Sequence, residues 1–206
     1  MHTVLQINTS LFSGSGQSTR LADEFVARWK ESHPDGRVIV RDLVRDPIPH
    51  LTAEAFRGFS VAPGARTPEQ RAAVALSDAL IDELKRADLI VLGLPMYNFS
   101  VPSTLKAYFD YVARAGVTFR YTENGSVGLL GGRRAIVFAA RGGIYAGTAD
   151  DTETRYVEQF LNFIGIAPVT FVHAEGLAID ARTREEGLAQ ARACTEKLLA
   201  QETEAA

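Results

Sequence analysis

Residues 88–94, with the sequence DLIVLGL, decide the fold class, because Leu89 to Leu92 are apolar at every position rather than at every second one. Residues 134–139 repeat this pattern as RAIVFA. A strand that helices cover on both faces needs continuous apolar residues, as in a parallel sheet. The two stretches therefore predict two central strands of a parallel sheet.

Three further short stretches rich in branched apolar residues complete the predicted sheet. They are Thr3–Asn8, Arg37–Asp42 and 169–173. Longer amphipathic stretches separate the five strands, and this alternation is typical of βα units around a parallel sheet. We expect an α/β fold with a doubly wound sheet, built as a single domain over residues 1–206.

Helix boundaries carry signals of their own. Thr67, Pro68 and Gln70 form a capping signature, with a hydroxyl at the cap, proline at the first helical position and an amide three residues after the cap. Thr183 and Glu186 stand at the same spacing. The sequence therefore predicts that Thr183 caps the last helix.

Two connections are longer than a plain βα fold needs. Residues 43–66 are too apolar for a solvated linker, so we expect them to cover a pocket or to pack on another subunit. Residues 116–133 contain Asn124 and Gly125, a strong β-hairpin signal. Gly165 follows an apolar helical stretch and is expected to end it as a left-handed cap.

Composition limits the partners of the chain. Hydrophobic residues make up 46% and charged residues 23% of its 206 residues, which is ordinary for a globular protein. A formal net charge of −3 without basic runs argues against nucleic acid and anionic membranes as partners. Cys194 is the only cysteine, lies on an apolar helical stripe and is expected to be a buried thiol. With no secretory signal or membrane span visible, we expect a cytoplasmic protein.

The titratable residues suggest neither a metal site nor an acid, base or nucleophile constellation. The histidines are His2, His33, His50 and His173, and none of their spacings is typical of metal ligands, so we expect no metal. His173 lies in the last predicted strand and is expected to be a hydrogen-bonded structural residue. A bound cofactor that carries the chemistry would explain why the protein lacks such a constellation.

Ligands of an open parallel sheet bind beyond the carboxyl ends of its strands, where the strand order reverses. Residues 10–18 follow the first strand there, and their hydroxyls, glycines and helix start suit a phosphate. One alternative is a flexible turn in which Ser18 is an ordinary helix cap. Another is a dinucleotide fingerprint, since Gly14 and Gly16 have the right spacing and Asp42 ends the second strand, although Thr19 replaces the third glycine. We prefer a monophosphate site.

The loop after the third strand, 95–102, places aromatic, thioether and amide groups at the expected switch point. Aromatic rings and sulfur suit a flat, polarisable ring system, and amides can hydrogen-bond its polar edge. The alternative is that Tyr97 and Phe99 are simply core aromatics. The candidate binding residues here are Met96, Tyr97, Asn98 and Phe99.

The fourth strand is followed by Ala140, Arg141, Gly142 and Gly143. Paired glycines let a backbone approach a ligand closely, although a plain glycine turn has the same composition. Arg141 is interpreted either as a partner for an anion or as a surface charge.

Three stretches together resemble one family: 96–99 (MYNF), 113–125 (ARAGVTFRYTENG) and 141–143 (RGG) are similar to the bacterial FMN-dependent NADH azoreductases. The resemblance runs nearly end to end, from the first strand to 174–176. It implies a flavodoxin-like fold with strand order 2-1-3-4-5 and helices on both faces. It also implies non-covalent FMN and a homodimer with two active sites at the subunit interface.

The resemblance also assigns roles to residues. It places the FMN phosphate on Ser10, Gly16, Gln17 and Ser18. It places the flavin ring against Met96, Tyr97, Asn98 and Phe99, and against Ala140, Arg141, Gly142 and Gly143. Gly16 and Ala140 stand where many members have serine, so their side-chain contacts are lost or replaced by backbone contacts. We expect the substrate to face Phe99, Tyr121 and Phe163, the last two by resemblance.

By the same resemblance, the expected activity is a ping-pong oxidoreduction. NADH or NADPH reduces the flavin and leaves, and a quinone or an aromatic azo compound then takes its place. The main alternative is a flavodoxin-like electron carrier without its own substrate pocket. A hydrolase would need a metal cluster or an activated water, and a phosphorylated receiver would need an aspartate where Leu94 and Pro95 end the third strand.

Overall fold

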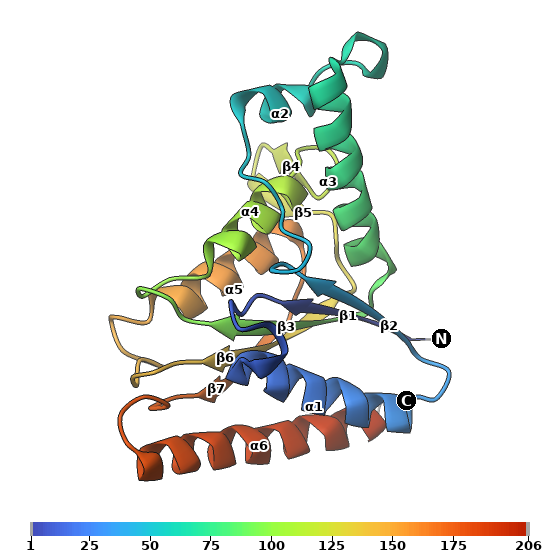
Figure 1. Cartoon of the computed structure of the whole chain (residues 1–206). Coiled ribbons are helices and arrows are strands. Elements are labelled where there is room, and N and C mark those ends of the chain that lie inside the picture. The colour runs from blue at the N-terminus through green and yellow to red at the C-terminus, as the bar shows by residue number, and fades with distance from the viewer. Residues whose placement is uncertain (1, 205–206) are drawn as a thin grey trace.

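The computed structural model describes residues 2–204, and its centre is a five-stranded parallel sheet of order β2-β1-β3-β6-β7 (Figure 1). Its strands are β1 (Thr3–Asn8), β2 (Arg37–Asp42), β3 (Leu89–Pro95), β6 (Arg134–Ala140) and β7 (Val169–Ala174). All four neighbouring pairs are parallel. The five predicted strands are confirmed with shifts of at most one residue at an end. Their predicted order is also found, with the last two labels changed because a separate hairpin, β4–β5, precedes β6.

Helices cover both faces of the sheet (Figure 1). One face carries α1 (Gln17–Ser32) and α6 (Ala181–Glu204), and the other carries α3 (Pro68–Arg86), α4 (Ser103–Val112) and α5 (Thr152–Ile164). All seven residues of β3 are buried, as expected for a strand covered twice. The two hydrophobic clusters of the core lie on the two sides of this sheet.

The sequence signals predicted the cap of α3 correctly and the cap of α6 wrongly. The Thr67 side chain accepts the N–H of Gln70, and the Gln70 side chain returns to the Thr67 N–H, so the predicted capping box of α3 is confirmed. The prediction that Thr183 caps α6 was wrong. Asp180 accepts the Thr183 N–H at 2.8 Å, because a carboxylate just before the helix is the better acceptor. Glu186 pairs with Arg182 instead.

The predicted hairpin is present as β4 (Phe119–Thr122) and β5 (Gly125–Gly128). Thr122 pairs with Gly125, so the connecting residues are Glu123 and Asn124, one position earlier than expected. Gly165 ends α5 in the left-handed region with φ 95°, as predicted. The backbone of the hairpin packs on it so closely that a Cβ on Gly128 would lie 2.1 Å from the Gly165 nitrogen.

The 43–66 connection contains a short helix, α2 (Ala53–Gly58), and a 3-10 turn, η2 (Pro63–Ala65). Its Phe59 ring contacts Tyr111 edge to face, and the guanidinium of Arg114 lies over Phe59. The Phe56 side chain, in contrast, is 61% exposed. Part of the connection therefore packs on α4, while part of its apolar surface faces outward.

Two sequence-based expectations concern the burial of the Cys194 thiol on α6 and membrane-spanning helices. Cys194 is partly buried against the core cluster beneath α1, so it is a packed thiol without complete burial. Among the described helices, none combines the length and the apolar composition that a membrane span requires.

Candidate active site

The three predicted segments meet at the carboxyl edge of the sheet, because they follow three neighbouring parallel strands, β1, β3 and β6. The Leu11 N–H donates to the Tyr97 hydroxyl at 3.2 Å, which joins the first segment to the second. The Thr152 hydroxyl donates to the Phe99 carbonyl, and the Phe99 and Tyr145 rings lie edge to face at 5.9 Å. The Met96 N–H donates to the Ala140 carbonyl at 3.2 Å, which joins the second segment to the third.

The first segment ends in free donors at the start of α1. Gly16 occupies the cap position and supplies no side-chain bond, so the alternative that Ser18 is the helix cap was wrong. The N–H groups of Gln17, Ser18 and Thr19 have no acceptor within the described chain, as expected for a first helical turn. The Ser18 hydroxyl is buried and also lacks a partner there.

These unpaired groups fit the phosphate of FMN. A buried hydroxyl without an acceptor is costly, and an anion at the positive end of a helix would supply one. Ser10 is buried beside this turn, with its oxygen accepting the Phe12 N–H at 3.3 Å. A Cβ on Gly16 would lie 2.1 Å from that oxygen, so the small residue at position 16 goes with the serine at position 10.

The dinucleotide alternative finds little support in the same turn. Asp42 accepts the N–H groups of Val44 and Arg45, so its carboxylate is used within its own turn. Close helix-to-strand packing comes from Gly93 of β3, where a Cβ would lie 3.2 Å from the Ser18 carbonyl. No third glycine in the loop is needed for this approach.

The second segment forms a strained turn. Tyr97 and Ser100 exchange two backbone hydrogen bonds of 2.9 and 3.1 Å. The two residues between them, Asn98 and Phe99, have φ of 51° and 63°. Such left-handed backbone costs roughly 1–2 kcal/mol at a non-glycine residue and clusters at ligand sites. Phe99 is 60% exposed, so its alternative role as a core aromatic was wrong, whereas Tyr97 is half-buried.

In the third segment every backbone carbonyl accepts a hydrogen bond, whereas three consecutive backbone N–H groups have no acceptor among the described residues. The carbonyls of Arg141, Gly142 and Gly143 accept from the turn after β7 at 2.8 to 3.1 Å. The N–H groups of Gly142, Gly143 and Ile144 have no acceptor among the described residues. Beside the buried Ala140, this turn presents consecutive backbone donors at the sheet edge.

The Arg141 side chain points into the protein instead of toward the turn's open side. It is fully buried and lies 3.0, 3.2 and 3.3 Å from carboxylate oxygens of Asp151, Glu153 and Glu175. The alternative that Arg141 is a surface charge was therefore wrong. Its guanidinium is also committed to three internal carboxyl groups.

Burial and charge shift the pKa values around Arg141. Desolvation raises the pKa of Glu153 to about 8, although Arg141 opposes the shift. Burial also acts on Asp151, but hydrogen bonds from Arg141 and Thr154 bring the pKa of this carboxyl below its usual range. Burial, followed by the charge of Arg141, lowers the pKa of His173. His173 Nδ1 is buried without a hydrogen-bond partner, so the expectation of a hydrogen-bonded histidine was wrong for this atom.

The three predicted substrate-facing aromatics do not meet within the chain. Thr152, at the start of α5, is bonded to Phe99. Phe163 lies near the end of α5 and contacts Phe119 at 4.4 Å, beside the exposed Tyr121. At about 1.5 Å per residue, Thr152 and Phe163 are roughly 16 Å apart along the helix.

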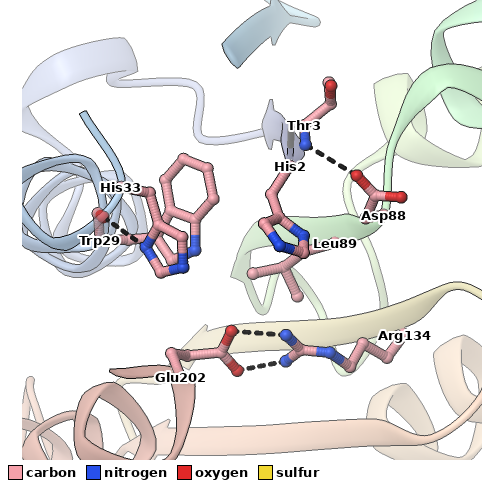
Figure 2. Close-up of a pocket in the computed structure, with 8 residues that line it drawn as sticks. All are labelled: His2, Thr3, Trp29, His33, Asp88, Leu89, Arg134 and Glu202. Atoms are coloured by element: carbon pink, nitrogen blue, oxygen red, sulfur yellow. Dashed lines mark hydrogen bonds and ion pairs between the residues drawn. The ribbon is translucent and has the colours of Figure 1, made fainter. Parts of the chain in front are cut away.

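A different cavity lies at the opposite, amino-terminal edge of the sheet (Figure 2). Its volume of about 40 Å³ suits a water molecule or two and not a cofactor. Arg134 and Glu202 form an ion pair along one side of it, and the Thr3 N–H donates to Asp88 at 2.8 Å (Figure 2). This edge is held together by internal contacts.

Sequence reasoning missed the acidic partners of Arg141, as well as Thr152 and Tyr145. Asp151 and Glu153 lie next to a helix start and Glu175 follows the last strand, where acidic residues are usually solvated. No spacing in the sequence links them to Arg141. The one available signal is the resemblance of 174–176 to the azoreductases, which assigns no role to Glu175.

Comparisons with known proteins agree with this geometry. A model of the flavodoxin-like fold family matches residues 2–199. An FMN-dependent NADH:quinone oxidoreductase of Cellvibrio japonicus is 52% identical over 177 residues, which cover 86% of this chain and 89% of that protein. A protein of the same name from Alcanivorax borkumensis is 53% identical over 189 residues, with 92% and 96% covered.

Solved structures give the same result. An azoreductase from Bacillus anthracis str. Sterne superposes with a TM-score of 0.89 at 30% identity, covering 97% of this chain and 99% of that one. An FMN-dependent NADH-azoreductase from Bacillus anthracis str. Ames Ancestor, in complex with FMN, gives a TM-score of 0.87 at 29% identity, with 98% and 99% covered. The chain belongs to the flavodoxin-like fold family and, within it, to the FMN-dependent NADH:quinone oxidoreductases.

Proposed function

We propose that this protein is an FMN-dependent oxidoreductase. It uses NADH or NADPH to reduce quinones to hydroquinones and to cleave aromatic azo compounds to amines. The observation that carries the proposal is the meeting of three segments at one edge of the sheet, each with unpaired donors or an exposed aromatic turn. The names of the relatives support the cofactor and both substrate classes. The single cysteine supports a reducing, cytoplasmic setting.

The residues divide between the two ends of the cofactor. The phosphate is assigned to the turn with the unpaired Ser18 hydroxyl, through Ser10, Gly16, Gln17 and Ser18. The flavin ring is assigned to the exposed turn formed by Met96, Tyr97, Asn98 and Phe99. Its polar edge is assigned to the backbone of Ala140, Arg141, Gly142 and Gly143, where the N–H groups of Gly142 and Gly143 have no acceptor among the described residues.

FMN, when bound, accepts and returns a hydride. The protein's part is to bind, orient and shield. The helix start would stabilise the charge of the phosphate, and the glycine turn would donate hydrogen bonds to the polar edge of the ring. The left-handed Phe99 turn exposes an aromatic ring, against which a flat acceptor can stack.

A second copy of the chain would complete the substrate site. Phe163 and Tyr121 lie at the far end of α5 from Phe99, so one protomer cannot bring all three to the same substrate. We therefore assign Phe163 and Tyr121 to the active site of the partner in a homodimer. The exposed Phe56 in the 43–66 connection offers further apolar surface for such an interface.

The visible spectrum of the purified protein tests the cofactor. We expect a yellow protein whose flavin absorption bleaches when NADH is added without oxygen. Steady-state NADH consumption with a quinone then separates an enzyme from a pure electron carrier, which would show none. A preparation that stays colourless after incubation with excess FMN would contradict the proposal.

Replacing Phe163 tests the shared site. Phe163→Ala should change the KM ratio between a quinone and an azo compound while FMN remains bound. Sedimentation or size exclusion of the same variant should still give a dimer. Loss of FMN, with acceptor preference unchanged, would make Phe163 a structural residue.

A further inference from the structure

We infer that Arg141 is a positioning residue for flavin binding: with Asp151, Glu153 and Glu175 it fixes both the glycine turn and the Phe99 turn. The inference rests on the proposed function. It adds a role for a buried side chain that lies behind the turn expected to meet the ring.

The guanidinium of Arg141 makes four polar contacts. Nε lies 3.2 Å from Glu153, Nη1 lies 3.3 Å from Glu175, and Nη2 lies 3.0 Å from Asp151 and 2.7 Å from the Thr154 hydroxyl. The Arg141 side chain is fully buried. A planar fork that contacts three carboxyl groups on two elements, the start of α5 and the turn after β7, has a single position, and this position fixes the backbone of the adjoining Gly142.

One of these carboxylates, Glu175, also holds the chain just after the third segment. Oε1 of Glu175 accepts the N–H groups of Tyr145 and Ala146 at 2.8 and 2.9 Å. The chain between Arg141 and Tyr145 is therefore anchored at both ends to the same cluster. Its two glycines have no side chains to order them, so their N–H directions depend on these anchors together with the carbonyl hydrogen bonds from 176–178, the residues that directly follow Glu175.

Asp151 and Glu175 link the cluster to the strained aromatic turn through the residues that they hold. Asp151 caps α5 by accepting the Thr154 N–H at 3.1 Å, which fixes the first turn of that helix. The next residue, Thr152, donates its hydroxyl to the Phe99 carbonyl. Tyr145, held by Glu175, places its ring against Phe99. The left-handed backbone of Phe99 is thus supported from both sides by parts of one cluster.

The cluster also carries a charge imbalance. The charged groups that act on Glu153 are Arg141 and Asp151, and Glu175 and His173 interact with the same Arg141. One guanidinium cannot neutralise three carboxylates, and Glu153 Oε1 has no partner in the described structure. Burial raises the pKa of Glu153 to about 8, so this carboxyl holds a proton at neutral pH. Above that pH its ionisation adds a buried, uncompensated charge behind the glycine turn.

The test measures the dissociation of FMN from the holoenzyme on dilution, followed by flavin fluorescence. Thr152→Val removes only the hydroxyl that holds Phe99. Loss of one hydrogen bond of about 1 kcal/mol predicts roughly fivefold faster dissociation. Arg141→Lys replaces the fork by a point charge, and we expect acceleration of about 100-fold or more together with a changed absorption spectrum of bound flavin. The matched control is Thr183→Val, whose hydroxyl bonds only its own helix cap, Asp180, and which should stay within about twofold.

A pH comparison separates positioning from a merely structural role. Wild-type dissociation should accelerate several-fold between pH 7 and pH 9, and in Glu153→Gln, which cannot ionise, the ratio should fall close to one. Equal dissociation in wild type, Thr152→Val and Arg141→Lys would overturn the inference, as would an unchanged pH ratio in Glu153→Gln. If Arg141→Lys does not fold, Thr152→Val and the pH ratio decide. A wild-type protein without FMN affinity would instead overturn the proposed function, and this inference with it.

Discussion

Strand β6 has an arginine at each of its two ends, and the two arginines are held very differently. Arg134 is the first residue of the strand, with a side chain that is 42% exposed and paired with Glu202 alone (Figure 2). Arg141 follows the last residue of the strand, has no exposed side-chain surface and contacts three carboxylates. The same residue type therefore closes a surface contact at one edge and organises a buried cluster at the other.

The difference extends to the two edges of the sheet. At the amino edge, polar groups such as the Thr3 N–H and the Arg134 guanidinium find partners within the chain, and the remaining cavity is small. At the carboxyl edge the Ser18 hydroxyl and the N–H groups of Gly142 and Gly143 remain unpaired. The polar groups of the amino edge therefore contribute to stability, and those of the carboxyl edge remain available for a ligand. Substitutions at the two edges should accordingly change different properties of the protein.

The largest expected effect is the loss of the buried guanidinium. Arg141→Met leaves the buried carboxyl groups of Asp151 and Glu153 and the partly buried Glu175 without their shared cation, and should lower the free energy of unfolding by about 3–5 kcal/mol. Arg134→Met removes a partly exposed pair and should cost about 1 kcal/mol or less. Urea unfolding of both variants measures the two values, and equal losses would abolish the contrast between the two ends of β6.

The pH dependence of stability sharpens the contrast. The folded protein keeps the Glu153 proton up to about pH 8, whereas the unfolded chain releases it near pH 4.5. Between these values the folded state binds more protons, so this group lowers stability as pH rises, by up to about 1.4 kcal/mol per pH unit. Above pH 8 its contribution is constant.

Glu153→Gln isolates that contribution. Its stability should decline less than that of the wild type between pH 5 and pH 8 when both are unfolded with urea. Glu196→Gln, at an exposed ion pair, is the matched control and should follow the wild-type slope. Parallel curves for wild type and Glu153→Gln would show that Glu153 is ionised in the folded protein at neutral pH.

The sequence anticipated features that depend on local composition. Continuous apolar residues identified β3 and β6, and the capping box of α3 was readable because its residues lie within one turn. The three binding segments followed from the topology rule, since their place depends only on strand ends. The proposed contacts of the individual residues with FMN remain predictions.

Other features depend on tertiary contacts and carry no sequence signal. Arg141 meets Glu175 across 34 positions, and only the pairing of β6 with β7 brings them together. Phe99 adopts a left-handed backbone that its residue type disfavours, because the contacts of Thr152 and Tyr145 support it. Asp180 is the cap of α6 instead of Thr183, because its carboxylate just before the helix is the better acceptor for the Thr183 N–H.

Substitutions at two glycines should have smaller effects, and each should change either stability or FMN affinity alone. Gly36 lies before β2 at the amino edge, where a Cβ would meet the buried Trp29 ring at 2.5 Å. Gly36→Ala should lower stability by about 1–3 kcal/mol through overpacking and leave FMN affinity unchanged. Gly16→Ala should instead weaken FMN binding, because its Cβ displaces the Ser10 hydroxyl from the phosphate turn.

The control for both variants is Gly14→Ala, which has open space around its Cβ. Denaturation curves and FMN titrations of the three proteins should therefore give one change in stability, one change in affinity and one neutral result. Weakened FMN binding in Gly36→Ala would show that the two edges are coupled through the sheet.

The smallest expected effect comes from the amino edge itself. Asp88 accepts the Thr3 N–H at 2.8 Å near the start of β1. Asp88→Ala removes this acceptor at a partly exposed strand end, where water replaces it, so the free energy of unfolding should fall by about 0.5–1.5 kcal/mol. The rate of FMN dissociation should not change. Strands β1 and β3 join the two edges through a rigid, fully paired backbone. The loss of one hydrogen bond at the amino edge therefore does not reorient the N–H groups at the carboxyl edge. Faster FMN release in this variant, at unchanged secondary structure, would mean that strand position rather than the Arg141 cluster sets the geometry of the carboxyl edge.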